Sequence, residues 1–340
     1  MKVKYMTATP ANTVDVTAIG HAIVDVLAKA DEAFLDAHGI PKGGMTLIDE
    51  EAAEEMYGKM EPVAEVSGGS AANSIACISS LGGRAAFIGK VGSDPLGQTF
   101  QDNLKSIGVT FNSVPLVDGL PTGRCLINVT ADAERSMATF LGAAGLVASD
   151  DVDDALVEGA AITFFEGYLF ERENARAAFA KSCALAKASG RKTAITLSDA
   201  GVVERQKETL VSFITENLDI VLANEDEAKE FFGTDDLSAM ADKASDICEI
   251  FVVTRSEKGS VILAKGQGPI VVDAVAPTQL LDSTGAGDAY AGGFLYGLAR
   301  GLPLEQSGRL GSLSASEVIS HFGARPEKNL KEMASESGLL

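Results

Sequence analysis

The chain has 340 residues with a formal net charge of −20, 46% hydrophobic residues and four cysteines. This acidic balance argues against a nucleic-acid backbone or an anionic membrane surface, so we expect no nucleic acid and no membrane among its partners. The widely separated cysteines argue against a disulfide framework or a zinc site, and the N-terminal region lacks a signal-peptide core, which together predict a cytoplasmic protein.

The first predicted strand covers residues 14–19 and ends at Gly20. Extended structure resumes at once, so that His21, Ile23 and Asp25 follow the end of a strand, where α/β proteins bind ligands. An acid at such a place also commonly caps a turn, and the segment on its own leaves both interpretations open.

Short elements follow, with amphipathic helices at residues 31–38 and 49–60 and a short strand at 45–48 between them. Their mixed pattern predicts a small appendage rather than the repeating units of a parallel sheet. A predicted hairpin with strands at 126–129 and 136–140 belongs to the same appendage, and Arg135 lies at the start of its second strand. We expect Arg135 to contact a phosphate, although an edge strand also commonly carries a solvated charge.

The segment Ser-Gly-Gly-Ser-Ala-Ala-Asn (67–73) predicts a glycine turn that opens a helix. Gly68, Gly69 and Ser70 would let the backbone approach a ligand, and Asn73, one turn into the helix, could bond a hydroxyl. Tight packing at a helix entry would explain the glycines but not Asn73.

From residue 155 onward the pattern is regular α/β, with predicted strands at 161–165, 193–197, 220–223, 250–254 and 261–263. It predicts a doubly wound, mostly parallel sheet flanked by helices, with an antiparallel addition near its edge. Without a repeat or a long linker, residues 1–340 form one domain, with a small β-rich lid built from inserted segments at roughly 22–63 and 112–142.

The segment Asp-Ser-Thr-Gly-Ala-Gly-Asp (282–288) places small residues before a predicted helix and an acid at its start. Backbone N–H groups of Gly285, Ala286 and Gly287, together with the helix dipole, would bind an anion. A carboxylate there would repel a phosphate unless it faced another atom, and we therefore interpret Asp288 as the base for an attacking hydroxyl. An acid in a first helical turn is the simpler alternative, and the segment by itself fits both.

Two commoner nucleotide motifs are absent. Residues 83–90 have one residue too many for a P-loop, and Val91 stands where that motif needs a hydroxyl. Residues 285–290 end on Tyr290 instead of the last glycine of G-x-G-x-x-G. A dinucleotide-binding dehydrogenase is therefore disfavoured.

Four motifs in order make the chain resemble the ribokinase-like, or phosphofructokinase-B, family of sugar and nucleoside kinases over nearly its whole length. Residues 282–288 resemble D-T-x-G-A-G-D, residues 68–73 resemble G-G-x-x-x-N, residues 224–227 resemble N-x-x-E, and residues 89–94 resemble G-x-x-G-x-D. The resemblance implies a ribokinase-like fold, ATP and Mg²⁺ as cofactors, and in many members activation by a monovalent cation such as K⁺.

The resemblance also assigns roles. It implies Asp288 as the base beside the anion hole, and Asp25 and Asn73 as ligands of substrate hydroxyls. On the nucleotide side, Glu227 would hold magnesium through water. The remaining expected ATP contacts are Asn224, Thr254, Gly259, Thr284, Gly285 and Gly287.

The hairpin directs the substrate prediction. Pro-Thr-Gly-Arg-Cys (121–125) and Arg-Ser (135–136) look like the adenosine kinase branch. The side chains expected to offer apolar surface to a base are Ile23, Cys125, Met137 and Leu141, which ordinary packing within the lid would also explain.

The predicted reaction is therefore ATP-dependent phosphorylation of the 5′-hydroxyl of a purine nucleoside, with adenosine giving AMP. His21 and Thr284 depart from the asparagines of related nucleoside kinases, which leaves inosine, guanosine or a ribose- or fructose-like sugar open. The alternatives are a sugar kinase and a catalytically silent nucleoside-binding protein. Partners are a small-molecule substrate and ATP, and the chain could be a monomer or a homodimer.

Overall fold

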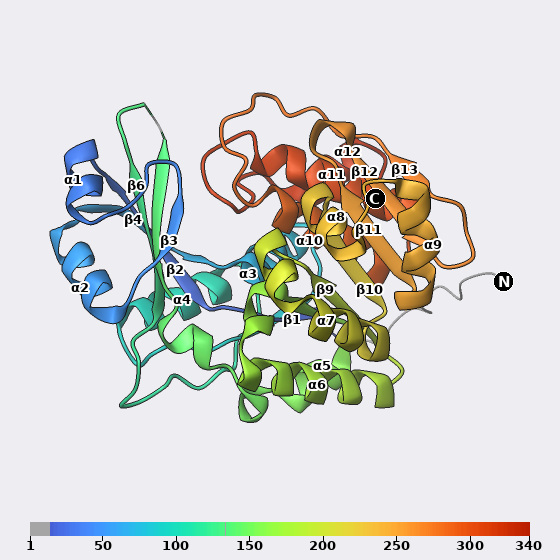
Figure 1. The fold of residues 1–340 in the computed structure, drawn as a ribbon, viewed down its shortest axis with the longest axis horizontal. Helices are drawn as coiled ribbons and strands as arrows, with labels where there is room; N and C mark the ends of the chain where they lie inside the picture. Colours follow the sequence, from blue (N-terminus) through green and yellow to red (C-terminus); the bar gives the residue numbers. More distant parts are fainter. Residues whose placement is uncertain (1–13, 133) are drawn as a thin grey trace.

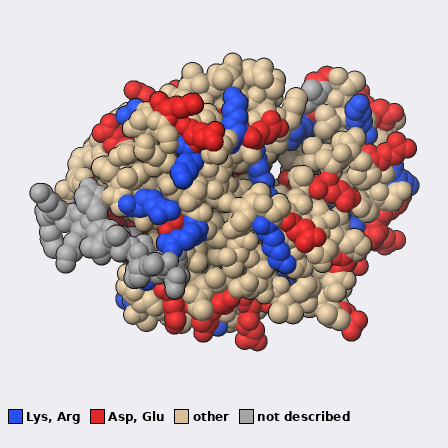
Figure 2. All heavy atoms as spheres, turned by 180° about the vertical axis from the view of Figure 1, so that it is seen from behind, with Lys and Arg blue, Asp and Glu red and all other residues tan. Residues whose placement is uncertain are grey.

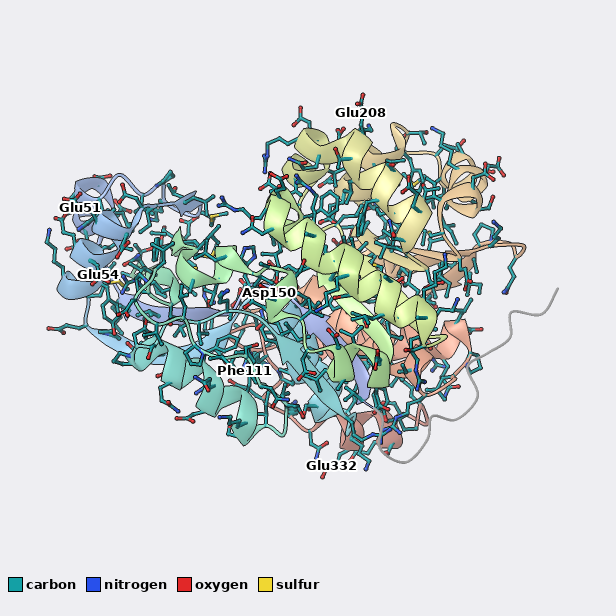
Figure 3. The ribbon with its side chains drawn as sticks, turned by 90° about the horizontal axis from the view of Figure 1, so that it is seen from below. Glu51, Glu54, Phe111, Asp150, Glu208 and Glu332 are labelled. Atoms are coloured by element: carbon teal, nitrogen blue, oxygen red, sulfur yellow. The ribbon has the colours of Figure 1, made fainter. Side chains whose placement is uncertain are left out.

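A computed structural model describes residues 14–132 and 134–340 of the chain. The described residues form two parts that meet along one edge (Figure 1). The larger part, called the larger layer below, is an eight-stranded sheet with helices on both faces, and the smaller part, called the smaller layer, is a five-stranded sheet with its own helices. Viewed from below, Glu51 and Glu54 mark the smaller layer, and Glu208 marks the far side of the larger one (Figure 3).

The larger sheet has eight strands in the order β13-β12-β11-β10-β9-β8-β1-β5. Six are parallel, and β12 and β13 add to the edge in antiparallel fashion. The sequence predicts an antiparallel addition near the edge and the strand β12, but not the strand β13. Their bounds are β1 Val14–Ile19, β5 Ala85–Ile88, β8 Ala160–Glu166, β9 Lys192–Thr196, β10 Ile220–Asn224, β11 Ile250–Thr254, β12 Ser260–Ala264 and β13 Ile270–Val272.

Helices cover both faces of this sheet, because successive strand residues point to opposite sides. In β8, Phe164 joins the core beneath α3, α10 and α11, whereas Phe165 joins a second core beneath α5 to α9. The helices are α1 Glu32–Ala37, α2 Glu50–Lys59, α3 Ser70–Ser80, α4 Pro95–Ser106, α5 Asp154–Gly159, α6 Glu173–Ala188, α7 Ala200–Asn217, α8 Glu225–Phe232, α9 Leu237–Ile247, α10 Ala286–Ala299, α11 Leu304–Val318 and α12 Leu330–Glu336. The predicted doubly wound, mostly parallel sheet flanked by helices is confirmed.

The smaller sheet has five strands in the order β3-β7-β6-β2-β4. One face packs on α1, α2 and α4 through residues such as Val24 and Leu126, and this packing continues the main core. The opposite face carries a separate apolar cluster. The strands are β2 Ile23–Lys29, β3 Met45–Leu47, β4 Pro62–Gly68, β6 Gly123–Val129 and β7 Arg135–Phe140.

Strand β4 is the main element of the smaller sheet that the sequence interpretation missed. It begins at Pro62, contains Glu65, and lies at the sheet edge, where a residue without an N–H donor is tolerated. The predicted glycine turn is therefore the end of a strand, and Gly69, with a φ of 94°, is the N-cap of α3. This strand pairs Gly68 with Ile23 on its neighbour β2, and the Asp25 carboxylate lies against Gly68.

The surface agrees with the acidic composition. On the face in Figure 2, Lys and Arg side chains are interspersed with Asp and Glu, and a notch separates the two layers. Within residues 14–132 and 134–340, no helix combines the length and the apolar character that a membrane crossing needs.

Candidate active site

The candidate site lies at the carboxyl ends of the parallel strands, where the two layers meet. It is built from the segments after β1 and β8, the N-termini of α3 and α10, two strands of the smaller sheet, and the loop at residues 319–329. Parallel sheets of this type bind ligands at this edge because the loops that follow the strands leave a crevice there.

The predicted anion turn has the backbone geometry that such a role needs. Gly285 caps α10 with a φ of 78°, and a Cβ on it would lie 2.6 Å from the Cβ of Ala324. The first helical bond runs from the Ala289 N–H to the Gly285 carbonyl, so the preceding N–H groups have no acceptor within the helix, although the Ala286 N–H donates to the Ser283 carbonyl in the turn at 3.2 Å. A Cβ on Gly287 would meet nothing within 4 Å, which shows that open space lies beside the turn.

Asp288 is the third residue of α10, and both of its carboxylate oxygens are held from α3. The Ser70 hydroxyl donates to Oδ1 at 2.6 Å, and the Asn73 amide donates to Oδ2 at 3.1 Å. Burial raises the Asp288 pKa to about 6, although these two hydrogen bonds lower it. The carboxylate is thus fixed in orientation and is a stronger base than an ordinary aspartate.

Asp25 faces the same space from β2. A Cβ on Gly68 would lie 2.4 Å from its carboxylate, which explains why glycine stands there. Burial raises the Asp25 pKa to about 6, while Arg325 and Arg135 lower it and Asp288 raises it further. The structure therefore brings together two predicted carboxylates, one on strand β2 of the smaller sheet and one on helix α10 of the larger layer.

His21 is buried, and its environment includes a carboxylate that the sequence interpretation did not single out. Its Nδ1 lies 2.5 Å from Oε1 of Glu166, the last residue of β8. The other oxygen of Glu166 accepts the N–H groups of His21 and Ala71, and a Cβ on Gly20 would collide with it. The sequence offered one signal for Glu166, because it is a lone acid at the end of the largely apolar segment that forms β8.

Arg325 is the second functional candidate that the sequence interpretation missed. From the loop after α11 its Nε donates to Oδ1 of Asn73 at 3.2 Å, and its Nη1 donates to the Ser67 hydroxyl at 2.5 Å. No sequence pattern marks this residue, because a lone arginine in a loop is usually solvated.

Arg135 connects the smaller sheet to the anion turn. Its Nη1 lies 3.0 Å from Oδ2 of Asp282, and its guanidinium lies over the Phe322 ring at 5.4 Å. The same Asp282 oxygen accepts the Gly323 N–H, while Oδ1 accepts the N–H of the exposed Thr284. In this arrangement Arg135 contacts the first residue of the predicted phosphate motif.

The four predicted apolar side chains, Ile23, Cys125, Met137 and Leu141, belong to one cluster on the site-facing side of the smaller sheet. Leu141 also lines an adjoining cavity of about 240 Å³. Since Ile127 and Ala144 belong to the same cluster, packing within the sheet remains an alternative explanation.

The nucleotide-side residues have local structural explanations. Asn224 caps α8, and the Glu227 carboxylate accepts from both the backbone and the amide nitrogen of Asn224. Burial raises the Glu227 pKa to about 7. Thr254 ends β11 with its hydroxyl 3.4 Å from the Ala223 carbonyl, and Gly259, with a φ of 77°, turns the chain where a Cβ would collide with β13.

No cluster of three or more His, Cys, Asp or Glu side chains in the described part of the chain could hold a metal ion directly. The carboxylate and amide oxygens of Glu227 and Asn224 are donors that Mg²⁺ accepts, but both residues are engaged with one another. These residues would therefore hold a magnesium ion only through water.

The doubly wound sheet, the second sheet across its carboxyl edge, and the glycine turn with its hydrogen-bonded, partly buried aspartate define a ribokinase-like kinase. The chain belongs to the pfkB family of carbohydrate kinases, because the sequence model of that family matches residues 37–330. It is accordingly a phosphotransferase that acts on hydroxyl groups.

The relatives include kinases of both substrate types. A solved adenosine kinase from Sinorhizobium meliloti is 42% identical with a TM-score of 0.87, and the match covers 96% of this chain and 99% of that one. A solved probable sugar kinase from Rhizobium etli is 40% identical with a TM-score of 0.88 and the same coverage. Adenosine kinase 1 of Arabidopsis thaliana is 27% identical over 91% of this chain and 95% of its own length.

Proposed function

We propose that this kinase transfers the γ-phosphate of ATP to the 5′-hydroxyl of a purine nucleoside, with adenosine as its preferred acceptor. The observation that carries the proposal is the pair of partly buried carboxylates, Asp25 and Asp288, that interact electrostatically beside the apolar cluster of the smaller sheet. A ribose with its hydroxyls on the carboxylates would place its base against Ile23, Cys125, Met137 and Leu141. The adenosine kinase relatives support the same choice.

In the proposed reaction Asp288 accepts the proton of the 5′-hydroxyl as the new O–P bond forms. The bond between the γ-phosphorus and the bridging oxygen breaks, ADP leaves, and Asp288 later releases the proton to solvent. The N–H groups at 285–287 stabilise the transferred phosphoryl group, and Arg135 adds positive charge at the same turn. Because the transition state is loose, the chain contributes mainly through positioning.

The smaller sheet would act as a lid over the acceptor. Its contact with the larger layer through Arg135 and Asp282 supports this role, because a closed site would keep water away from the γ-phosphate. On the other side, Thr254, Gly259 and Thr284 would lie beside ATP. Magnesium held through water by Glu227 would neutralise phosphate charge, while Asn224 fixes that carboxylate. Cytoplasmic purine salvage is the setting that this activity implies.

ADP release, followed with a coupled assay over a panel of nucleosides and sugars, tests the proposal. Adenosine should give the highest kcat/KM, and the product should carry phosphate at the 5′ position. Turnover of a sugar without turnover of any nucleoside would overturn the nucleoside assignment. Ligand-stabilised melting with no ADP formation would instead indicate a silent binding protein.

A sugar acceptor is the second candidate, and one feature of the site favours it. The buried pair of His21 and Glu166 places polar atoms near the acceptor end of the site. A nucleobase would need few polar partners there, whereas a sugar could use several. The probable sugar kinase among the solved relatives supports the same alternative. The substrate panel decides between the two acceptors.

A further inference from the structure

Arg325 reaches the acceptor side from a segment that no recognised motif covers. Its side chain bonds both Ser67, near the end of β4, and Asn73, in α3. Asn73 is the last residue of the G-G-x-x-x-N motif, and Ser67 directly precedes that motif. The third guanidinium nitrogen, Nη2, is buried and has no partner among the described residues. An unsatisfied guanidinium N–H is costly, so a polar group that could accept from it would be favoured there.

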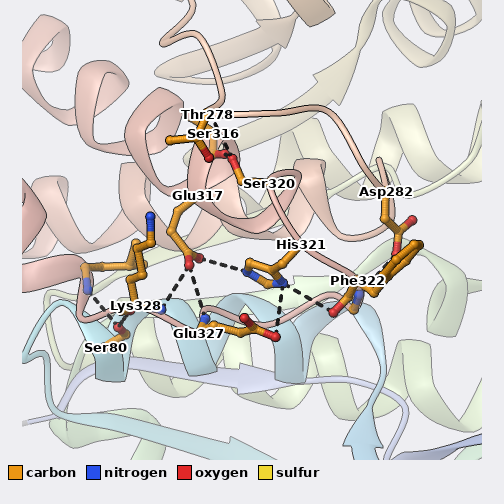
Figure 4. Close-up of polar contacts among 12 residues, drawn as sticks. Ser80, Thr278, Asp282, Ser316, Glu317, Ser320, His321, Phe322, Glu327 and Lys328 are labelled. Carbon is orange, nitrogen blue, oxygen red and sulfur yellow. Dashed lines mark hydrogen bonds and ion pairs between the residues drawn. The ribbon is translucent and has the colours of Figure 1, made fainter.

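The loop that carries Arg325 is held in place on both sides (Figure 4). At the end of α11 the buried Glu317 carboxylate accepts the N–H groups of Glu327 and Lys328 and contacts His321. Between these points the Gly323 N–H donates to Asp282. The guanidinium is therefore presented by an ordered loop, and little entropy is lost when it binds a ligand.

The Nε contact of Arg325 determines which way the Asn73 amide faces. Because Arg325 donates to Oδ1, the Nδ2 group of Asn73 is directed at Asp288. A reversed amide would place a carbonyl oxygen against the Asp288 carboxylate and an N–H₂ group against a cation. Arg325 thus orients, through Asn73, the carboxylate that faces the attacking hydroxyl.

The Arg325 guanidinium interacts electrostatically with the Asp25 and Asp288 carboxylates, but it forms an ion pair with neither. Asp25 and Asp288 each raise the pKa of Arg325, which burial lowers to about 10. Among the described residues, however, neither carboxylate comes within the 4.0 Å of an ion pair with Arg325. A hydroxyl fits between such groups, because it can donate to a carboxylate and accept from a guanidinium at the same time.

We propose that Arg325 is a specificity-determining residue that donates from Nη2 to a ring hydroxyl of the acceptor, and that its Nε positions Asn73 and Asp288. The hydroxyl would donate in turn to Asp25. This inference rests on the proposed acceptor side of the site, but it holds for a nucleoside or a sugar.

The test compares Arg325→Gln and Arg325→Lys with the wild-type enzyme. The acceptors are adenosine, 2′-deoxyadenosine and 3′-deoxyadenosine, or ribose and its deoxy counterparts if the wild-type enzyme turns over only sugars. Arg205→Gln is the matched control, because the Arg205 side chain is exposed and pairs with the Glu171 carboxylate rather than with a residue of the acceptor side. Melting temperatures verify that each variant is folded.

For Arg325→Gln we expect kcat/KM for the full acceptor to fall about 10- to 100-fold, the range of a hydrogen bond to a charged group, while KM for ATP stays within about twofold. With the deoxy acceptor that lacks the contacted hydroxyl, the loss should shrink to about threefold or less, and Arg325→Lys should restore part of the activity. Equal losses on all acceptors would indicate a purely structural role and overturn the inference, as would unchanged kinetics of a folded variant. Failure of the wild-type enzyme on nucleosides would refute only the nucleoside assignment.

Discussion

The acceptor side and the nucleotide side of the site are built in different ways. On the acceptor side, contacts join residues far apart in the chain, such as Ser70 with Asp288 and Ser67 with Arg325, at separations of 218 and 258 residues. On the nucleotide side, Asn224 and Glu227 bond each other at a separation of three residues.

The two sides also differ in how completely their polar atoms are paired. Within the part of the chain that the structure describes, buried nitrogens without partners occur at His21, Arg135 and Arg325 on the acceptor side, whereas both carboxylate oxygens of Glu227 accept hydrogen bonds. A helix cap explains the nucleotide-side motif even without a ligand. No helix cap accounts for the unpaired nitrogens of the acceptor side. We therefore propose that the acceptor side carries both the chemistry and the choice of substrate.

Replacement of Asp288 by Asn should have the largest effect. The substitution keeps the shape and the Ser70 contact but removes the base, so we expect kcat to fall about 10²- to 10⁴-fold. ATP affinity, measured by equilibrium binding, should be largely retained. Asp246→Asn, at an exposed site on α9, is the matched control, and near-normal turnover of Asp288→Asn would refute the base role.

Replacement of Asp25 by Asn should have the next largest effect. Loss of a charge-assisted hydrogen bond to an acceptor hydroxyl should raise KM for the acceptor about 10- to 100-fold, with a smaller change in kcat. Steady-state kinetics with the acceptor varied at saturating ATP measure this. An unchanged KM for the acceptor would show that Asp25 does not bind it.

Replacement of Arg135 by Gln should have an intermediate effect. The variant loses the ion pair with Asp282 that connects the smaller sheet to the anion turn. We expect kcat to fall about tenfold and ATP hydrolysis without an acceptor to rise, because closure would be less complete. Arg124→Gln, on the neighbouring strand and paired with Glu54, tests whether any loss of charge in this sheet has the same effect.

Replacement of Glu227 by Gln should have the smallest effect on folding. Glutamine can still accept from the Asn224 backbone, so the melting temperature should change little. The magnesium concentration needed for half-maximal activity should nevertheless rise severalfold. If magnesium dependence were unchanged, Glu227 would serve only to cap α8.

The same contrast explains what could be predicted from the sequence. The strands of the large sheet and the turn before Asp288 were predictable because apolar runs and glycine spacing are local signals. Strand β4 was missed because Pro62 and Glu65 interrupt the pattern that an edge strand can tolerate.

Glu166 and Arg325 were missed for another reason. Each acts through partners more than 90 residues away in the chain, as the contacts of Glu166 with Ala71 (95 residues) and of Arg325 with Asn73 (252 residues) show. Residue type and local spacing carry no record of such contacts. The predicted roles of the individual site residues stay predictions until kinetics test them.

The most direct test of Asp288 as the base is the single-turnover rate of phosphoryl transfer measured against pH with both substrates saturating. Burial raises the Asp288 pKa to about 6, so the carboxylate takes up a proton, and loses its ability to accept one, as the pH falls through that value. The rate should fall about tenfold per pH unit below about pH 6, and this acid limb should persist in Glu227→Gln, which removes the other carboxylate that titrates nearby, with a pKa raised to about 7. In Asp25→Asn the limb should also persist but move to lower pH, because loss of the neighbouring negative charge lowers the Asp288 pKa. A rate that stays constant down to about pH 5 would contradict the assignment of Asp288 as the base.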